Sequence, residues 1–435
     1  MIDINNSQDI LFQKALKKHQ NGKYHDALNL YQKLLIINPN IAALHNNIGL
    51  IHIEFNKKQL ALQCFLTAIN IDENFVEAHN NLGILYEEQG DFNKAISHCQ
   101  TAIKIKPDFS KAYINLGSSF DEIGKKNFAI ESYKKSIKLD PNSVESYNNL
   151  GSIFRYSGDY ERAIKYYQKA IQINKNYPKA RKNIGLVYLL LSNFHKGFEE
   201  FEWRIMEKNK NEYRDLELKS LLWNGENLDG KIILILSEQG IGDIIQFARY
   251  IYELQERYKV KIIFRTHKKL IHLFDNCEFQ IINEEDSIPK HDYHIYLMSL
   301  TRFYYRIENK LLGEVNYIKN KNKFSLWKKK LSKIKLPKIG LNWQGGTIFK
   351  RDKFRSIPLN YFEPLFNLHG LEYINLQKGY GVEQIKNFKY KEKLKFFNPE
   401  FDIEKEENAF EDTIELLFNL DLVITSCTAV AHLSS

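Results

Sequence analysis

The chain has 435 residues, of which 43% are hydrophobic and 26% are charged, and its formal net charge at pH 7 is +9. This length exceeds what a single hydrophobic core supports, so two or three domains are expected. The composition is that of a soluble globular protein and excludes a disordered chain. A transmembrane segment is also excluded, because no apolar run approaches the ~18 residues that span a bilayer.

The charge and the cysteines bear on partners and location. Lysine is enriched throughout the chain and not in one patch, so the positive charge does not predict a nucleic-acid partner. The N-terminus lacks the basic segment and apolar stretch of a signal peptide. The cysteines form no CxxC pair, so a reducing, cytoplasmic location is expected. They are Cys64, Cys99, Cys277 and Cys427.

Small residues recur every 34 residues across the first half of the chain. A fixed period of this kind indicates one supersecondary unit that is repeated and stacked. Each small residue would let two antiparallel helices approach closely, while larger residues between them fill the gaps. The pattern resembles that of tetratricopeptide repeats and covers residues 8–205. Its glycines and alanines are Gly49, Gly83, Gly117, Gly151, Gly185, Ala27, Ala61, Ala95, Ala129 and Ala163.

The period predicts five full repeats and a divergent sixth, which together form an all-α solenoid. In the sixth repeat Gly197 replaces the alanine, and the aromatic residues after it are expected to pack the end of the solenoid. A solenoid presents a concave groove that usually binds protein segments. A protein or peptide partner is therefore expected in this groove.

An asparagine recurs with the same period, immediately before the leucine or isoleucine of each repeat. A carboxamide donates and accepts hydrogen bonds at once, so a regular array can hold the backbone of an extended peptide. A similar array lines the solenoid of the nucleocytoplasmic protein O-GlcNAc transferases. The alternative is that each asparagine satisfies local helix contacts. The asparagines are Asn47, Asn81, Asn115, Asn149 and Asn183.

The period ends near Trp203, and a connector over residues 206–228 leads into a different kind of sequence. The apolar run 232–236 predicts a buried parallel strand, followed by a glycine turn and a helix. Strands and helices then alternate in two blocks, 229–325 and 326–435, which predicts two Rossmann-like α/β lobes facing each other across a cleft. Further strands are expected at 260–264, 293–298, 338–343, 372–375 and 420–425, and a helix at 409–419.

Several short motifs follow one another in this half. They are Trp223-x-Gly225, Glu238-Gln239-Gly240-x-Gly242-Asp243, Gln246-Phe247-x-Arg249-Tyr250, Ser299-Leu300, Gly340-x-x-Trp343-x-Gly345, Arg355-Ser356-Ile357-Pro358-Leu359 and Thr428-Ala429-x-Ala431-His432-Leu433. As an ordered set over residues 220–435, they resemble the glycosyltransferase domain of bacterial tetratricopeptide-repeat proteins, which is similar to the family 9 ADP-heptose heptosyltransferases with their GT-B fold. The resemblance implies inverting transfer of a hexosyl, heptosyl or N-acetylglucosaminyl group from a nucleotide-sugar to an acceptor hydroxyl, with no structural metal and no cofactor.

The resemblance gives roles to two charged residues. Asp243 matches the aspartate proposed as general base for the acceptor; an N-cap of a helix that begins at Ile244 would also explain its position. Arg355 matches a basic residue that contacts the donor diphosphate, a task that suits a planar guanidinium. The alternative for Arg355 is a surface arginine in a charged run.

Four more residues complete the expected donor site, where exposed N–H groups at the start of a helix would hold phosphate. They are Gly240, Gly242, Thr428 and His432. His432 could equally be a packed core histidine. Two features depart from the family: Cys427 stands where these sequences usually carry aspartate, and the chain stops at Ser435, barely one turn into that helix. The second lobe is therefore expected to be incomplete, either because this sequence is a fragment or because the domain itself lacks the remaining elements.

Two hypotheses of different classes follow. The first is a glycosyltransferase whose solenoid presents an acceptor such as a protein. The second is a non-enzymatic repeat scaffold whose transferase-like half is degenerate. Protein O-GlcNAc transfer is a third, which rests only on the asparagine array and the architecture.

Overall fold

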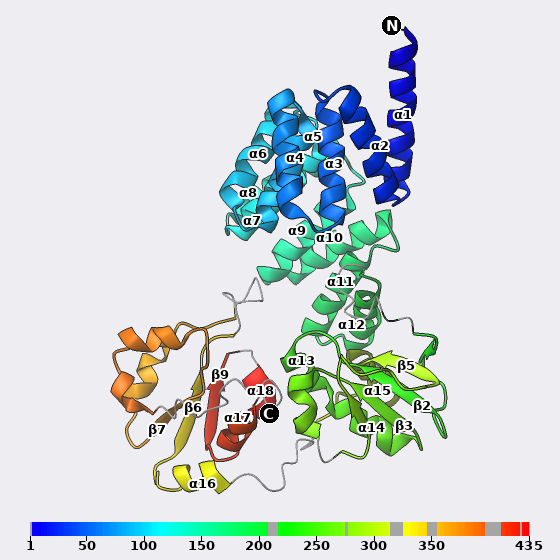
Figure 1. The fold of residues 1–435 in the computed structure, drawn as a ribbon. Coiled ribbons are helices and arrows are strands. Elements are labelled where there is room, and N and C mark those ends of the chain that lie inside the picture. Colours follow the sequence, from blue (N-terminus) through cyan, green and yellow to red (C-terminus); the bar gives the residue numbers. More distant parts are fainter. Residues whose placement is uncertain are drawn as a thin grey trace. The chain divides into compact units, whose positions relative to one another are not determined.

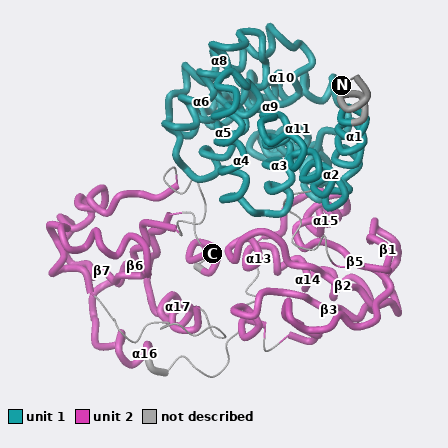
Figure 2. The backbone as a smooth tube through the Cα atoms, turned by 45° about the horizontal axis from the view of Figure 1, so that its top comes forward, with its two compact units in different colours: residues 1–207 teal, residues 208–435 magenta. Residues whose placement is uncertain are grey.

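The structure is a computed structural model, and it divides into two compact units, Met1–Glu207 and Lys208–Ser435 (Figure 2). Each unit is considered by itself. The structure describes residues 2–207, 216, 218–274, 277–313, 325–345, 355–395, 410–426 and 429–434. Cys427, Thr428 and Ser435, which the sequence analysis singled out, lie outside these ranges.

Paired antiparallel helices build the N-terminal unit (Figure 1). Each odd-numbered helix packs against the even-numbered helix that follows it, and a 3₁₀ turn at Glu202–Met206 ends the unit. The helices are Ile2–Gln20 (α1), Tyr24–Ile37 (α2), Ala42–Glu54 (α3), Lys58–Ile71 (α4), Val76–Glu88 (α5), Phe92–Ile105 (α6), Ser110–Glu122 (α7), Lys126–Leu139 (α8), Val144–Tyr156 (α9), Tyr160–Ile173 (α10), Pro178–Leu190 (α11) and Phe194–Phe201 (α12).

The periodic glycines let the two helices of a pair approach as the sequence predicts. A methyl group added at Gly151 in α9 would lie 2.6 Å from a ring carbon of Tyr167 in α10, which is far closer than two carbons can pack. Tyr167 itself is fully buried. The same arrangement joins Gly117 to Tyr133, 2.7 Å from the added methyl group. Glycine is therefore required here by space, not by backbone conformation.

Two parallel sheets form the C-terminal unit. The first has the order β1-β5-β2-β3-β4 and the second the order β8-β7-β6-β9, and every pairing is parallel. The strands are Leu221–Leu222 (β1), Ile232–Leu236 (β2), Lys261–Arg265 (β3), Gln280–Ile282 (β4), Tyr293–Tyr296 (β5), Lys338–Asn342 (β6), Glu372–Asn375 (β7), Leu394–Lys395 (β8) and Leu422–Thr425 (β9). The helices are Ile241–Phe247 (α13), Arg249–Arg257 (α14), Leu300–Glu308 (α15), Ser325–Leu331 (α16), Glu411–Leu417 (α17) and Ala429–Ser434 (α18).

Both sheets repeat the strand order of half a doubly wound fold. In each, the first long strand (β2 or β6) is flanked on one side by the next two strands in sequence and on the other by the last strand, β5 or β9. Successive strands are therefore added on one side of β2 or β6, and the last strand is added on the other side. The strand order thus switches at the β2/β5 boundary of the first sheet and at the β6/β9 boundary of the second. Ligands of open α/β sheets bind outside the carboxyl ends of the strands at such switch points.

Two boundaries differ from the expectation. The short strand Leu221–Leu222 and the buried Trp223 belong to the first lobe, although the sequence analysis placed them in a connector. Pairing with β5, and not local sequence pattern, makes this two-residue segment a strand. The helix after the glycine turn begins at Ile241 instead of Ile244, so Asp243 lies inside its first turn.

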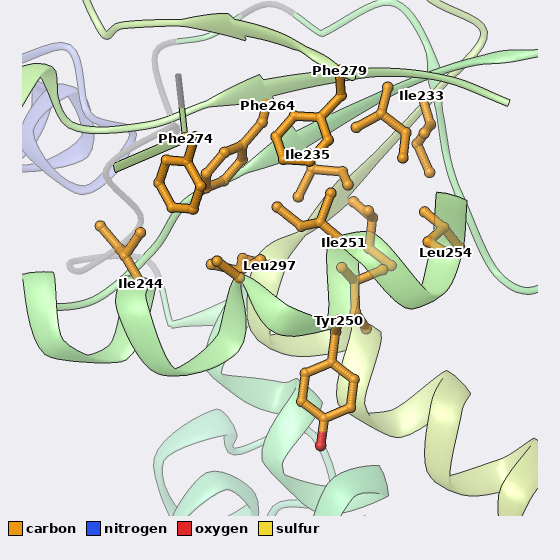
Figure 3. Packing of buried hydrophobic residues seen from close by; sticks show 14 of the residues in the cluster. Ile233, Ile235, Ile244, Tyr250, Ile251, Leu254, Phe264, Phe274, Phe279 and Leu297 are labelled. Atoms are coloured by element: carbon orange, nitrogen blue, oxygen red, sulfur yellow. The ribbon is translucent and has the colours of Figure 1, made fainter. Parts of the chain in front are cut away.

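The core of the first lobe lies between its sheet and its helices. Figure 3 shows the rings of Phe264, Phe274 and Phe279 gathered on the sheet side, opposite Ile244 and Leu297. The rings of Phe264 and Phe274 meet edge to face, with centroids 5.4 Å apart. Residues of the second lobe also reach this core: Ile414 of α17 is part of it, and Ala429 and Leu433 of α18 pack against it. The two lobes therefore contact each other through α13, α17 and α18.

Candidate functional site

The candidate site begins at the turn between β2 and α13. Gln239 adopts φ = 66°, a left-handed conformation that is uncommon outside glycine, and Gly240 follows as the N-cap of α13. The Asp243 carboxylate accepts a hydrogen bond from the Gly240 N–H over 3.2 Å. The N-cap is therefore Gly240, and the N-cap role that the sequence offered for Asp243 is wrong; Asp243 is the third residue of the helix, and its carboxylate binds the N-cap backbone.

Asp243 lies among charged residues from other parts of the chain. Burial raises the pKa of its carboxyl above the ordinary value, while the Gly240 N–H and the charges of His432 and Arg355 act to lower it. Arg355 and His432, which the family resemblance assigned separately, thus both act on the electrostatics of Asp243.

Helix α18 approaches α13 at Gly242. A methyl group added at Gly242 would lie 3.1 Å from the Cδ2 of His432 and 3.4 Å from the Cα of Ala429. Gly242 has no left-handed backbone conformation, so close approach of α18 is what favours glycine there. Burial lowers the pKa of His432, the Asp243 charge raises it, and the Arg249 charge lowers it.

The segment that carries Arg355 is attached to the loop after β6. The N–H of Ile357 donates to the Trp343 carbonyl over 2.8 Å, and the N–H of Gly345 donates to the Ser356 hydroxyl over 3.3 Å. Arg355 is half-buried. Its partial exposure is compatible with a donor contact and with the surface arginine that was the alternative in the sequence analysis.

Sequence reasoning missed two kinds of residue near this site. Arg249 stands in one of the ordered motifs but received no role, although its charge acts on His432. Glu238 accepts a hydrogen bond from the Met298 N–H over 3.1 Å, which ties the loops after β2 and β5 together at the switch point. Their positions next to the glycine turn and its helix were the available signal.

The periodic asparagines are half-buried, and three of them link neighbouring repeats. The amide Nδ2 of Asn81 donates to Asn46 over 2.8 Å, that of Asn115 to Asn80 over 2.8 Å, and that of Asn183 to Asn148 over 3.0 Å. The accepting asparagines are 5% exposed. The array therefore makes contacts between repeats. Within the part of the chain that the structure describes, the Oδ1 atoms of these three donors accept no hydrogen bond.

The array is interrupted once. Asn149 has Ile114 at the position where the other asparagines find their partner, and its Oδ1 accepts instead from Asn148 over 3.2 Å. Asn47 belongs to α3, the first helix to carry the array. The hydrogen bonds show that these asparagines connect neighbouring repeats. Their binding of a peptide is a hypothesis.

Metal-ligating side chains and membrane-spanning helices are considered next. Among the described residues, no group of three or more His, Cys, Asp or Glu side chains is placed to hold a metal ion. None of the helices in the described ranges is long and apolar enough to cross a bilayer.

Comparison with known families identifies the repeats. The model of the tetratricopeptide repeat matches residues 76–109 and 144–177, and a second model, described as TPR repeat, matches residues 56–90 and 122–154. The N-terminal unit is therefore a solenoid of tetratricopeptide repeats. Stacked repeats of this kind form extended concave surfaces suited to binding, which supports a protein-interaction role.

Individual relatives are more distant. Protein FlbA of Caulobacter vibrioides is 24% identical over an alignment of 270 residues. The alignment covers 56% of this chain and 44% of FlbA, so the chain spans less than half of that protein. Crystal structures of MamA share 26% identity, with 38% of this chain and 96% of MamA covered and a TM-score of 0.33. PilF of Pseudomonas aeruginosa is 19% identical; the match covers 49% of this chain and 97% of PilF, with a TM-score of 0.42. YrrB, described as a TPR protein with an unusual peptide-binding site, is 18% identical; the match covers 40% of this chain and 91% of YrrB, with a TM-score of 0.32.

Proposed function

We propose that the C-terminal unit is a glycosyltransferase of the GT-B type, which moves a sugar from a nucleotide-sugar to an acceptor bound by the repeats. The observation that carries the proposal is the contact of α13 with α18, which places His432 within 3.1 Å of a methyl group added at Gly242, beside Asp243. The charges of His432 and Arg355 both act on the Asp243 carboxyl. Two sheets of the same strand order, each with a switch point, support it further. Fold and charge placement thus agree with the motifs.

The proposed reaction needs a base for the acceptor. The acceptor oxygen would attack the anomeric carbon, its proton would pass to Asp243, and the bond from that carbon to the diphosphate oxygen would break. Burial raises the pKa of Asp243, which makes the carboxylate a stronger base, while nearby positive charge keeps its ionised form accessible. These opposing influences suit a general base that works near neutral pH.

The departing diphosphate needs positive charge on the opposite side of the reaction. A guanidinium supplies it through two parallel hydrogen bonds, which is the role proposed for Arg355. Gly240, Gly242 and His432 would line the donor, and Thr428 is proposed to join them from beyond the described residues. The donor would bind as a substrate, with no further cofactor in the proposal.

The repeats would supply the acceptor. Tetratricopeptide repeats bind proteins, so the acceptor is proposed to be a protein or to be carried by one. The free Oδ1 atoms of Asn81, Asn115 and Asn183 could each accept an N–H from an extended peptide. A cytoplasmic location is part of the same proposal.

The test is donor turnover by the full chain. Release of nucleoside diphosphate is measured with a panel of UDP-, GDP- and ADP-sugars, with water as the acceptor in the absence of a known one. We expect Asp243→Asn to reduce turnover by at least about 100-fold while nucleotide binding persists, because asparagine can accept the Gly240 N–H but cannot take a proton. The matched control is Asp159→Asn, which alters the N-cap of α10 in the solenoid. Unchanged turnover in Asp243→Asn would remove this residue from the mechanism.

A scaffold without transferase activity is the second candidate. The family matches at residues 56–109 and 122–177 favour it, because they identify tetratricopeptide repeats, whose stacked helices form a binding surface. Under this alternative no donor of the panel is turned over, whereas peptides still bind the solenoid. Donor turnover by the wild-type chain would exclude it.

A further inference from the structure

Gln377 is a buried side chain in the second lobe that fills every hydrogen-bonding position it has. It follows β7 by two residues and is 4% exposed. Its Oε1 accepts from the backbone N–H groups of Trp343 over 3.0 Å and Gln344 over 2.8 Å. Its Nε2 donates to the carbonyls of Gln344 over 2.9 Å and Tyr380 over 2.7 Å. One side chain thus joins the loop after β6 to the loop after β7.

The loop after β6 is the same loop that holds the Arg355 segment. Trp343 accepts from the Ile357 N–H, and Gly345 donates to the Ser356 hydroxyl. Trp343 is fully buried, and its indole N–H donates to the Gly381 carbonyl over 3.0 Å. Gln377 and Gly381 therefore hold the described start of the loop, residues 343–345.

A second glutamine reinforces the connection. The Nε2 of Gln384 donates to the Oε1 of Gln344 over 2.9 Å, and the Oε1 of Gln384 accepts from the Leu359 N–H over 2.8 Å. Leu359 lies four residues after Arg355. The segment 355–359 is thus held to the loop after β6 directly and through Gln384.

We infer that Gln377 is a positioning residue, which sets the place of the Arg355 segment by fixing the backbone of Trp343 and Gln344. The inference rests on the proposed function, in which Arg355 contacts the donor diphosphate. An amide is required because Gln377 accepts two N–H groups and donates to two carbonyls at once. Glutamate would keep the acceptor but lose both donors, and leucine would leave all four backbone groups without their partner.

The experiment is a double-mutant cycle of Gln377→Leu and Arg355→Ala in the full chain. Affinities for ADP, UDP and GDP are measured by calorimetry, and amide exchange at Ile357 and Leu359 is measured in the same proteins. Gln377→Leu is expected to weaken binding of the preferred diphosphate by about tenfold, and Arg355→Ala by a similar factor. In the Arg355→Ala background it should weaken binding no further, because its effect passes through that arginine. Exchange at Ile357 and Leu359 should rise.

Two variants keep the test decisive. Asn419→Leu removes a different amide of the same lobe, which is half-buried and whose Nδ2 donates to the Glu415 carbonyl. It should change neither the diphosphate affinity nor the amide exchange at Ile357. Gln384→Met cuts the second connection without touching Gln377, and serves if Gln377→Leu does not fold. With it, exchange at Leu359 should rise and diphosphate affinity should fall less than with Gln377→Leu.

Each outcome has one meaning. Additive losses in the cycle would overturn the inference, because Gln377 would then act on binding by another route. If the wild-type chain binds none of the three diphosphates, the proposed function fails, and amide exchange alone decides the positioning role. Unchanged exchange at Ile357 and Leu359 in a folded Gln377→Leu or Gln384→Met protein would overturn that role.

Discussion

The third helix pair offers a quantitative test of how the repeats are specified. A methyl group added at Gly83 in α5 would lie 2.6 Å from the Sγ of Cys99 in α6, about 1 Å inside ordinary contact. Its next contact, with the Ala95 carbonyl oxygen, is 3.4 Å. Gly83→Ala should cost about 1–3 kcal/mol through overpacking, offset by about 1 kcal/mol because alanine favours a helix over glycine. Removal of the sulfur by Cys99→Ala should abolish the overpacking and leave the gain in helix propensity unchanged.

The two substitutions should therefore be coupled by about 1–3 kcal/mol in the free energy of unfolding. In the Cys99→Ala background, Gly83→Ala should stabilise by up to about 1 kcal/mol. Native-state hydrogen exchange of the amides in α5 and α6 measures this local free energy. The control is Gly90→Ala, where φ is 81° and no atom lies within 4 Å of the added methyl group, so its cost should be additive with Cys99→Ala. Equal destabilisation by Gly83→Ala in both backgrounds would refute the reasoning.

Three more outcomes are expected. Burial and the neighbouring His79, whose Nδ1 lies 3.1 Å from that of His98, lower the pKa of His98 below its ordinary value of 6.5. The unfolded chain therefore binds more protons, and stability should fall as the pH drops below 6.5 toward the folded-state pKa; urea titrations at several pH values should show a flatter dependence in His98→Gln. Asn80→Leu should cost about 1–3 kcal/mol in urea unfolding, because the buried acceptor of the Asn115 amide is lost. Arg355→Ala should weaken diphosphate binding measured by calorimetry, and an unaltered dissociation constant would contradict its role.

The helix pairs could be predicted because the same small and large residues recur in each repeat. Gly151 faces Tyr167 sixteen residues later, and Gly83 faces Cys99 at the same distance. The partners of the periodic asparagines were missed because they lie 35 residues away, one more than the period. The Asn-Asn dipeptide at residues 80–81 was the available signal, since its first member accepts from the next repeat and its second donates to the previous one.

The α/β half could be predicted only in part. The apolar run 232–236 is a buried strand in the structure because a parallel strand covered on both faces needs no polar alternation. Arg355 and His432 act on the charge of Asp243 although they follow it by 112 and 189 residues in the sequence, a relation that no periodicity or motif spacing predicts. Gln377 carries no sequence signal at all, since a single polar residue after a strand is ordinary. Its role follows from four backbone groups that only the folded chain brings to it.

Gly242 packs against α18 and therefore influences the burial, and with it the pKa, of His432. A helical glycine costs about 1 kcal/mol relative to alanine, so its presence is explained by the approach of α18. In Gly242→Ala the methyl group would press on His432, 3.1 Å away, and the imidazole should move outward by a few tenths of an ångström. Because burial is the main cause that lowers the pKa of His432, its pKa should then rise toward 6.5, as NMR titration of the ring would show. Gly240→Ala is the control, since its methyl group meets only the Asp243 carboxylate at 3.6 Å. An unchanged His432 titration in Gly242→Ala would mean that glycine is not what sets the distance between the two helices.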